Sequence, residues 1–346
     1  MPGSLPIGGI GGARPDGGLS DGSVNDGGNA FVNGRPFGYL WYAGVGLGAF
    51  LRDEVAISRD KGPGYLVAPS FDIKSFHDLA FDAAGNAWVI PTTGNQIVRL
   101  PAAALGRGAV PPTPDVIIHS DGLRSPQSLV FDGSGRLWVL NYAAVGFSTG
   151  NVIRFDALGS AQGTLTVTPS LTLNPGSSAA EQARFNQVTA LALDSASNLW
   201  VSAVGDVLRI DRASSLQGDV TAQPAAVLSG GEAYASLAFD GRGSLWVTAA
   251  GGGYLALRFD NPSAYTGEVK PVPSARVHLA AGTATFAGGM AADADGSLWV
   301  AMSNQLVKLA GASALTGEVT PQPAVVLGLV GSPDLASKLV LWSPTH

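Results

Sequence analysis

One short phrase returns five times along the chain of 346 residues: LAFDAAGNAWVI, LVFDGSGRLWVL, LALDSASNLWVS, LAFDGRGSLWVT and MAADADGSLWVA. Its Trp falls at Trp88, Trp138, Trp200, Trp246 and Trp299, which are 46 to 62 residues apart. A repeat of this length with strand–turn–strand character is typical of a β-propeller, in which each repeat forms one blade. The phrase therefore predicts an all-β fold.

Each repeat predicts four antiparallel strands. In the fourth copy, residues 237–240 and 245–248 form two strands joined by a tight turn, where Asp accepts N–H groups and Gly takes a positive φ. A third strand such as YLALRFD and an outer strand such as PAAVLSG follow. Between these two, a second phrase recurs as SSLQGDVTAQP, SAYTGEVKPVP and SALTGEVTPQP, and predicts a compact loop with one helical turn. Because the Asp and Trp recur in every copy, we interpret them as turn-forming and blade-packing residues.

A sixth blade is split between the two ends of the chain. Trp41, in GYLWYAG, lies 47 residues before Trp88 and fits the second strand of an earlier blade that lacks its first strand. We expect EVAISRD and GYLVAPS to be its third and fourth strands, and residues 334–344, DLASKLVLWSP, to supply the first. The prediction is a six-bladed β-propeller of four-stranded blades, closed by the C-terminal strand. Closure also removes exposed sheet edges.

The first 32 residues predict a flexible linker ahead of the propeller at 33–346. They are rich in Gly, Asp and Ser, and such a segment buries too little apolar surface to offset its ordering entropy. The segment resembles the tether that follows the lipid-anchor Cys of bacterial surface lipoproteins, and a plain disordered tail is the alternative. With 13% charged residues and no Cys, we expect an exported bacterial-type protein that is periplasmic, outer-membrane-anchored or extracellular.

Composition also excludes several partners. A net charge of −6 without clustered Lys and Arg argues against nucleic acid. No apolar run reaches 18 residues, so no transmembrane segment is expected, and the membrane contact we consider is the N-terminal tether. The absence of Cys excludes disulfides and a thiol nucleophile.

The connections of varying length predict where a ligand binds. Turns of the DxxG type and the TGEV-type loops share one face of the disc, so the other face carries the variable connections, which are longest at 141–151 and 173–187. Function concentrates in variable loops on a regular scaffold. The first residues of the inner strands line the channel mouth on this face and form a ring of His77, Gln127, Thr189, Ala235, Gly288 and Ser337. The predicted ligand-binding residues are His77, Gln127, Asn141, Tyr142, Asn186, Gln187, Tyr234 and Phe286.

The stretch ASLAFDGRGSLWVTAAGGGYLALRFD (235–260) resembles the NHL-repeat propellers, and more closely the regucalcin/gluconolactonase and virginiamycin B lyase-like families. The resemblance to the lactonases implies one divalent cation at the channel mouth, held by Glu, Asn and Asp from four blades. The ring named above has no carboxylate. The resemblance to the lyases implies a Glu just after the LWV strand, where this chain has Pro91, Asn141, Ala203, Ala249 and Met302. Only the fold is therefore carried over, and we predict no catalytic residue, metal or cofactor.

Two classes of function remain as the main hypotheses, and a third ranks below them. The first is a non-catalytic module that binds a small molecule, a carbohydrate, a peptide or a protein through the variable face, because aromatic and amide side chains together suit such ligands. The second is a divergent lactonase, hydrolase or lyase with His77 as general base. A passive surface or assembly module is the third.

Overall fold

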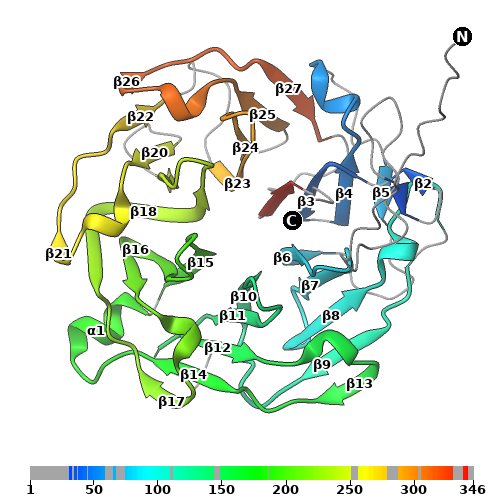
Figure 1. The fold of residues 1–346 in the computed structure, drawn as a ribbon, viewed down its shortest axis with the longest axis horizontal. Coiled ribbons are helices and arrows are strands. Elements are labelled where there is room, and N and C mark those ends of the chain that lie inside the picture. The colour runs from blue at the N-terminus through cyan, green and yellow to red at the C-terminus, as the bar shows by residue number, and fades with distance from the viewer. Residues whose placement is uncertain are drawn as a thin grey trace, which may run out of the picture.

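Six blades surround a central channel in the computed structural model, in five β-sheets because two neighbouring blades share one, and their inner strands lie next to one another (Figure 1). This confirms the predicted six-bladed propeller. The predicted linker lies outside the described residues except for Phe31–Val32, which forms β1 and pairs with β2 (Arg35–Pro36). The structure describes residues 31–32, 35–36, 38–44, 46–58, 65–67, 75–109, 112–143, 149–185, 187–250, 256–278, 287–302, 305–329 and 338–341.

The first three blades follow the chain from the closing blade onward, each counted from its inner strand. Blade 1 consists of β28 (Lys338–Leu341), β3 (Leu40–Gly44), β4 (Gly46–Phe50) and β5 (Tyr65–Val67). Blade 2 consists of β6 (Phe76–Phe81), β7 (Ala87–Pro91), β8 (Gln96–Leu100) and β9 (Val116–His119). Blade 3 consists of β10 (Pro126–Phe131), β11 (Leu137–Asn141), β12 (Asn151–Phe155) and β14 (Leu171–Asn174).

Blades 4 and 5 contain two long strands that each act as two successive strands of the propeller. One of them, β18 (Ala226–Phe239), belongs to both blades. Blade 4 consists of β15 (Val188–Leu193), β16 (Leu199–Ile210), which covers the second and third positions, and the first half of β18. Blade 5 consists of the second half of β18, β19 (Leu245–Ala250), β20 (Ala256–Phe259) and β22 (Ala275–Val277). Blade 6 consists of β23 (Ala287–Ala292), β24 (Leu298–Met302), β25 (Gln305–Leu309) and β27 (Val325–Gly328).

The two ends of the chain meet in blade 1, as predicted. β28 pairs antiparallel with β3 from Lys338↔Ala43 to Leu341↔Leu40 (Figure 1). On its other side β28 meets the inner strand of blade 6, where Gly289 lies against its backbone. A Cβ at Gly289 would come 2.5 Å from the Cα of Lys338, so only glycine allows this approach.

The predicted third strand of blade 1 is wrong. The third strand is β4, and the segment EVAISRD begins instead with a 3-10 turn at Glu54–Ala56, in which the Glu54 carboxylate accepts the Leu51 N–H at 2.8 Å. Two glycines make β4 hard to recognise as a strand in the sequence. Gly46, with φ +90°, makes the tight connection from β3, and Gly48 leaves room for the ring of Tyr42, which a Cβ would meet at 2.3 Å.

The TGEV-type phrases do more than connect two strands. Each begins with the predicted helical turn, a 3-10 turn, and then forms a short strand that pairs in parallel with the outer strand of the preceding blade. Parallel pairing between blades adds backbone hydrogen bonds to side-chain packing at the blade interface. The added strands are β13 (Gly163–Thr166) on β9, β17 (Gly218–Thr221) on β14, β21 (Gly267–Val269) on β18 and β26 (Gly317–Val319) on β22.

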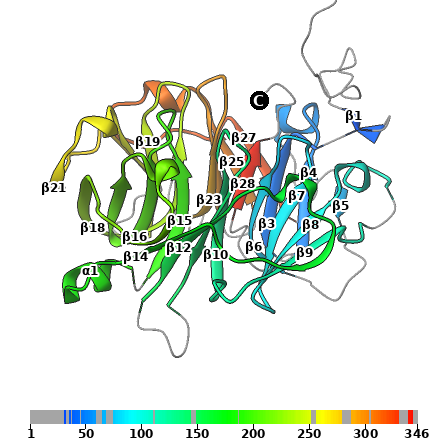
Figure 2. The same ribbon diagram turned by 60° about the horizontal axis from the view of Figure 1, so that its bottom comes forward.

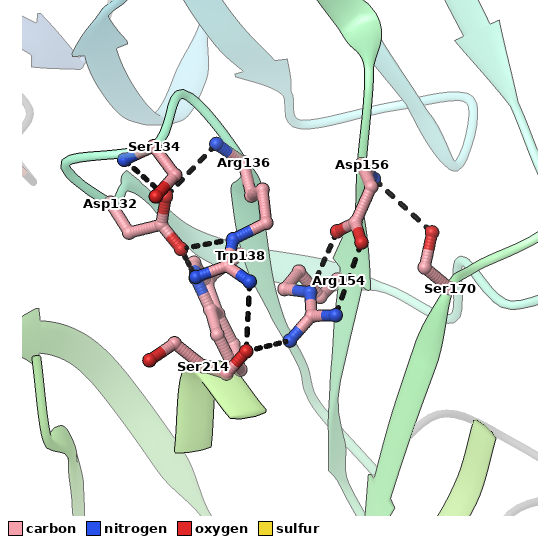
Figure 3. A network of polar contacts seen from close by, with 8 residues as sticks. All are labelled: Asp132, Ser134, Arg136, Trp138, Arg154, Asp156, Ser170 and Ser214. Carbon is pink, nitrogen blue, oxygen red and sulfur yellow. Dashed lines mark hydrogen bonds and ion pairs between the residues drawn. The ribbon is translucent and has the colours of Figure 1, made fainter. Parts of the chain in front are cut away.

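The recurring Asp and Trp are structural, as predicted. In blade 3, the Asp132 carboxylate accepts the N–H groups of Ser134 and Arg136 and, at 3.0 Å, the indole N–H of Trp138 (Figure 3). Trp138 is fully buried among residues of blade 4, including Leu191. The same Asp–Trp bond recurs in blades 2, 4 and 5. Blade 6 differs, because Asp293 accepts the Tyr39 hydroxyl of blade 1 at 2.8 Å, and the buried Trp299 N–H has no partner among the described residues.

In blades 2 to 5, an arginine of the third strand links the blade to the next one. In blade 3, the Arg154 guanidinium lies 5.1 Å from the centre of the Trp138 ring, holds Asp156 with two hydrogen bonds and donates to the Ser214 carbonyl of blade 4 (Figure 3). Equivalent bonds to the 3-10 turn of the following blade come from Arg99, Arg209 and Arg258. Among the described residues, no helix is long and apolar enough to cross a membrane.

Candidate functional site

The two faces of the disc differ as the sequence predicts. Side chains from the DxxG turns reach the 3-10 turns of the following blade, as in Arg136 Nη1 to Ser214 O (2.8 Å) and Arg242 Nη1 to Ser313 O (3.0 Å). These regular elements therefore share one face, which we call the turn face. The starts of the inner strands lie at the opposite end of the channel, on what we call the variable face.

Every inner strand from β6 to β23 has a β-bulge at its start. The ladder of β6 with β7 passes from Phe76↔Pro91 to Asp78↔Ile90, so His77 is the extra residue. Bulges re-aim a side chain and interrupt the alternation of a strand. Each bulge coincides with a predicted ring position. The other extra residues are Gln127, Thr189 and Ala235, and in β23 the shift falls at Gly288 and Gly289.

His77 is half-buried at the channel mouth. Burial lowers the pKa of its imidazole below the ordinary value, and the neighbouring Asp78 opposes this only in part. The ring is therefore neutral at neutral pH, with one nitrogen that donates and one that accepts a hydrogen bond. Within the described residues no hydrogen bond is made by this ring.

Gln127 and Tyr142 meet at the start of blade 3. The Gln127 amide donates to the Ser125 carbonyl at 3.4 Å, and the Tyr142 backbone N–H donates to the same oxygen at 3.1 Å. Asn95 of blade 2 accepts the Ser125 N–H at 2.8 Å, which joins the two blades at this rim. Both Gln127 and Tyr142 are partly exposed, so the structure brings these two predicted residues together on the variable face.

Thr189 continues the ring on blade 4. Its hydroxyl donates to the Tyr234 carbonyl of blade 5 at 2.9 Å and lies 2.7 Å from the Ser202 hydroxyl. The residue is exposed, and its bond to Tyr234 fixes the side chain across the boundary between the two blades.

Two of the predicted ligand-binding residues are buried. Asn141 is fully buried, where its amide donates to Gly122 O and Asn151 Oδ1 and accepts the Arg124 N–H, as one rung of an amide ladder across blade 3. Tyr234 is 3% exposed and packs in the core between blades 4 and 5. Gln187 is exposed beside the ring, and Asn186 and Phe286 lie outside the described residues.

The two long connections lie together, as predicted. The Gly150 N–H donates to the Phe185 carbonyl at 2.8 Å, which joins the first connection to the second. The second contains α1 (Ala179–Arg184), which starts at a capping box of Ser178 and Glu181 and lies at the lower side of the disc in Figure 2. Arg184 pairs with Asp206 and Glu268, which fixes the helix against blades 4 and 5.

The residues at the mouth do not fit a divalent cation. A hard cation takes several oxygen ligands that include carboxylates. The nearest carboxylate is Asp78, whose two oxygens accept the N–H groups of Leu79 (2.6 Å) and Leu129 (2.9 Å) and whose counter-ion is Lys338, 3.5 Å away. In the part of the chain that the structure describes, no three His, Asp or Glu side chains gather as a metal-binding group.

Sequence reasoning missed the roles of Asp78 and Lys338. Strand alternation places Asp78 away from the channel side of His77, but the bulge breaks that alternation. The residue after each bulge instead faces the next inner strand, where Asp78 accepts Leu129 N–H and Ser128 accepts Leu191 N–H. A signal was present in the sequence, because the residue that follows the ring position is charged in two blades. The residues at this position are Asp78, Ser128, Ala190, Ser236, Gly289 and Lys338.

Comparisons with known proteins find the same fold at low sequence identity. No family model matches the chain, and no curated protein matches it. Solved structures do, including a protein of unknown function from Bacteroides caccae (12% identity, TM-score 0.53), which covers 83% of this chain and 97% of that one. A putative 6-phosphogluconolactonase from Bacteroides fragilis has 12% identity, TM-score 0.51 and coverage of 82% and 81%. Virginiamycin B lyase from Staphylococcus aureus has 12% identity, TM-score 0.50 and coverage of 93% and 94%. The chain is thus structurally similar to lyase and lactonase-like six-bladed propellers.

Proposed function

We propose that this six-bladed propeller is a binding module that takes a small polar ligand, such as a sugar or a short peptide, at the channel mouth on its variable face. One observation carries the proposal. Each bulge turns a residue toward one rim of the channel, and these residues, unlike the Asp and Trp, differ from blade to blade. A scaffold that repeats its structural residues and varies one ring is suited to recognition.

The chemistry of the ring suits neutral hydrogen-bonding groups. His77 offers one donor and one acceptor, and Gln127 and Thr189 add amide and hydroxyl groups that both donate and accept. None of the three is charged at neutral pH, so a sugar hydroxyl or a peptide amide is a better match than an ion. The low charge and the Gly-rich N-terminal segment support an exported protein whose ligand is met outside the cytoplasm.

The test is a ligand screen followed by ring substitutions. Ligand that binds only the folded protein raises its melting temperature, so a thermal-shift screen with oligosaccharides, short peptides and lactones finds candidates. The double substitution His77→Ala and Gln127→Ala should abolish the shift given by a true ligand. Arg107→Ala, at a half-exposed position outside the ring, is the matched control. A ligand whose shift survives the double substitution binds elsewhere and would refute the proposal for that ligand.

A lyase or hydrolase site around His77 is the second candidate. Its support is the lowered pKa of His77, because a general base must be unprotonated at the working pH. The Asp78 carboxylate accepts two backbone N–H groups and so is not available to orient the imidazole. Turnover of a lactone or a cyclic depsipeptide that is lost in His77→Gln, with ligand binding retained, would favour this candidate over the binding module.

A further inference from the structure

The channel contains a cavity that opens on the turn face, away from the ring. Its volume is about 540 Å³, within the range of small-molecule sites. The inner strands of blades 1, 2, 3 and 6 form its walls, and the exposed turn residues Ala83, Gly133 and Gly135 form its rim. The proposed ligand site lies at the other end of the channel, so this cavity is a separate feature.

The walls of the cavity are mostly apolar. The partly exposed apolar residues that line it include Ala80, Val130, Phe131 and Val340, whereas Leu79, Leu129, Met290 and Leu339 are buried in the core between the blades. The cavity follows the last residues of one inner strand, 79–81, which at about 3.3 Å per residue span about 7 Å, and continues along the turn residues Asp82 and Ala83. A cavity of this length, enclosed by four strands, fits a narrow apolar chain.

One cation lies at the inner end of the cavity. The side chain of Lys338 lines it and is 18% exposed. Its counter-ion Asp78 already accepts two short backbone hydrogen bonds, and the Nζ to Oδ1 distance of the ion pair is 3.5 Å. An ammonium has three N–H donors, and within the described residues Lys338 makes this one long contact, which leaves room for a second anion. The inner end therefore suits a negatively charged group.

The rim limits how much negative charge a ligand can carry. Asp82 and Asp132 line the outer end of the cavity. Both carboxylates accept N–H groups of their own turns and the indole N–H of the following Trp, and Asp132 is also paired with Arg136 at 2.7 Å. A second negative group at the outer end of a ligand would be repelled, whereas an apolar end would not.

We propose that this cavity is a binding site for a free monocarboxylate with a linear apolar chain, with its carboxylate on Lys338 and its chain along the strands toward the turn face. Lys338 supplies charge complementarity at the inner end, and apolar walls supply the burial of the chain. The site does not depend on the ring at the variable face.

A chain-length series tests the proposal directly. Hexanoate, octanoate and decanoate are titrated into the full chain by calorimetry, each below its micelle concentration. Burial of a methylene contributes about 0.8 kcal/mol, so each added CH₂ should tighten binding about fourfold until the chain fills the cavity. Decyltrimethylammonium is the matched cation. Equal binding of the cation and decanoate, or no binding of decanoate at millimolar concentration, would overturn the proposal.

Substitutions locate the site. Lys338→Met should weaken decanoate binding at least tenfold, and Lys338→Arg should retain most of it. Lys270→Met removes an exposed lysine far from the channel and should leave the affinity unchanged. Ala83→Trp narrows the exposed rim without touching the core and should also weaken binding, which decides the question if Lys338→Met does not fold. Wild-type affinity in Lys338→Met or in Ala83→Trp would refute the site. The His77 and Gln127 double variant should bind decanoate normally.

Discussion

Replacement of Arg154 by Met should destabilise the propeller more than any change on its surface. The guanidinium is fully buried and links three groups: it holds the two oxygens of Asp156 at 2.7 and 3.1 Å, lies over Trp138 and donates to Ser214 O of the next blade (Figure 3). Met retains most of the apolar volume but none of these polar contacts. Removal of one partner of a buried ion pair costs about 3–5 kcal/mol.

Two features of the structure place the cost at or below the lower end of that range. The Asp156 side chain is 30% exposed, so water can solvate the carboxylate that loses its partner. The Ser214 carbonyl keeps a second donor, Arg136 Nη1, at 2.8 Å. We therefore expect a loss of about 2–3 kcal/mol in the free energy of unfolding. Removal of Arg136 and Arg154 together leaves Ser214 O without a donor, so the double variant should lose about 1 kcal/mol more than the sum of the single losses.

Urea unfolding followed by Trp fluorescence measures these losses. The control is Arg107→Met, because Arg107 is 51% exposed and its nearest carboxylate is 3.7 Å away, so its loss should stay within about 0.5 kcal/mol. A loss below 1 kcal/mol in Arg154→Met, or an equal loss in the control, would show that these arginine contacts do not hold the blades together.

Three further predictions address closure and acid stability. Gly289→Ala should cost about 1–3 kcal/mol because its Cβ meets the backbone of β28, whereas Gly241→Ala, which meets nothing within 4 Å, should be neutral in the same urea assay. Deletion of residues 332–346 removes β28 and should abolish cooperative unfolding by circular dichroism; a transition like that of the full chain would contradict closure. Burial raises the pKa of Asp132, but hydrogen bonds from Trp138 and Arg136 outweigh it and hold that pKa below its usual value. The unfolded chain therefore binds this proton first, so the stability is present above about pH 4 and lost as pH falls through the folded pKa. Urea titrations between pH 6 and 3 should show a smaller acid loss in Arg136→Met.

The fold could be predicted because its determinants repeat. Five copies of the phrase place Asp and Trp at a fixed spacing, and in four described blades the Trp N–H binds that Asp. The prediction failed for the third strand of blade 1, which lies outside the repeated phrase. In blade 1 the third strand contains two glycines in five residues, and the ring of Tyr42 fills the space that a side chain at Gly48 would need.

The sequence could predict where the candidate site lies, but not which of its side chains are used in contacts within the protein. Counting two residues back from the Leu or Met of each phrase finds the ring, and the bulges show that these positions are distinct in backbone geometry as well. Whether a side chain at such a position is free depends on contacts between blades. Asn141 is of a residue type that suits a ligand contact. Its amide nevertheless forms hydrogen bonds with Gly122, Arg124 and Asn151, which are 10 to 19 residues away in the sequence.

Lys338 shows why closure matters for function as well as for stability. In blades 2 and 3 the residue before the motif Leu is an acceptor that caps the next inner strand, as Asp78 and Ser128 do. The closing strand has a lysine there, which cannot accept, so Asp78 caps its own strand as well and becomes the lysine's counter-ion. Gly289, on the other side, leaves room for that strand. Ala190 and Gly289 also lack a side-chain acceptor at this position, but among the described inner strands the closing strand is the one that carries a cation there. Lys338 balances the charge of the buried Asp78, and its place on the wall of an apolar cavity also supports the carboxylate site proposed above.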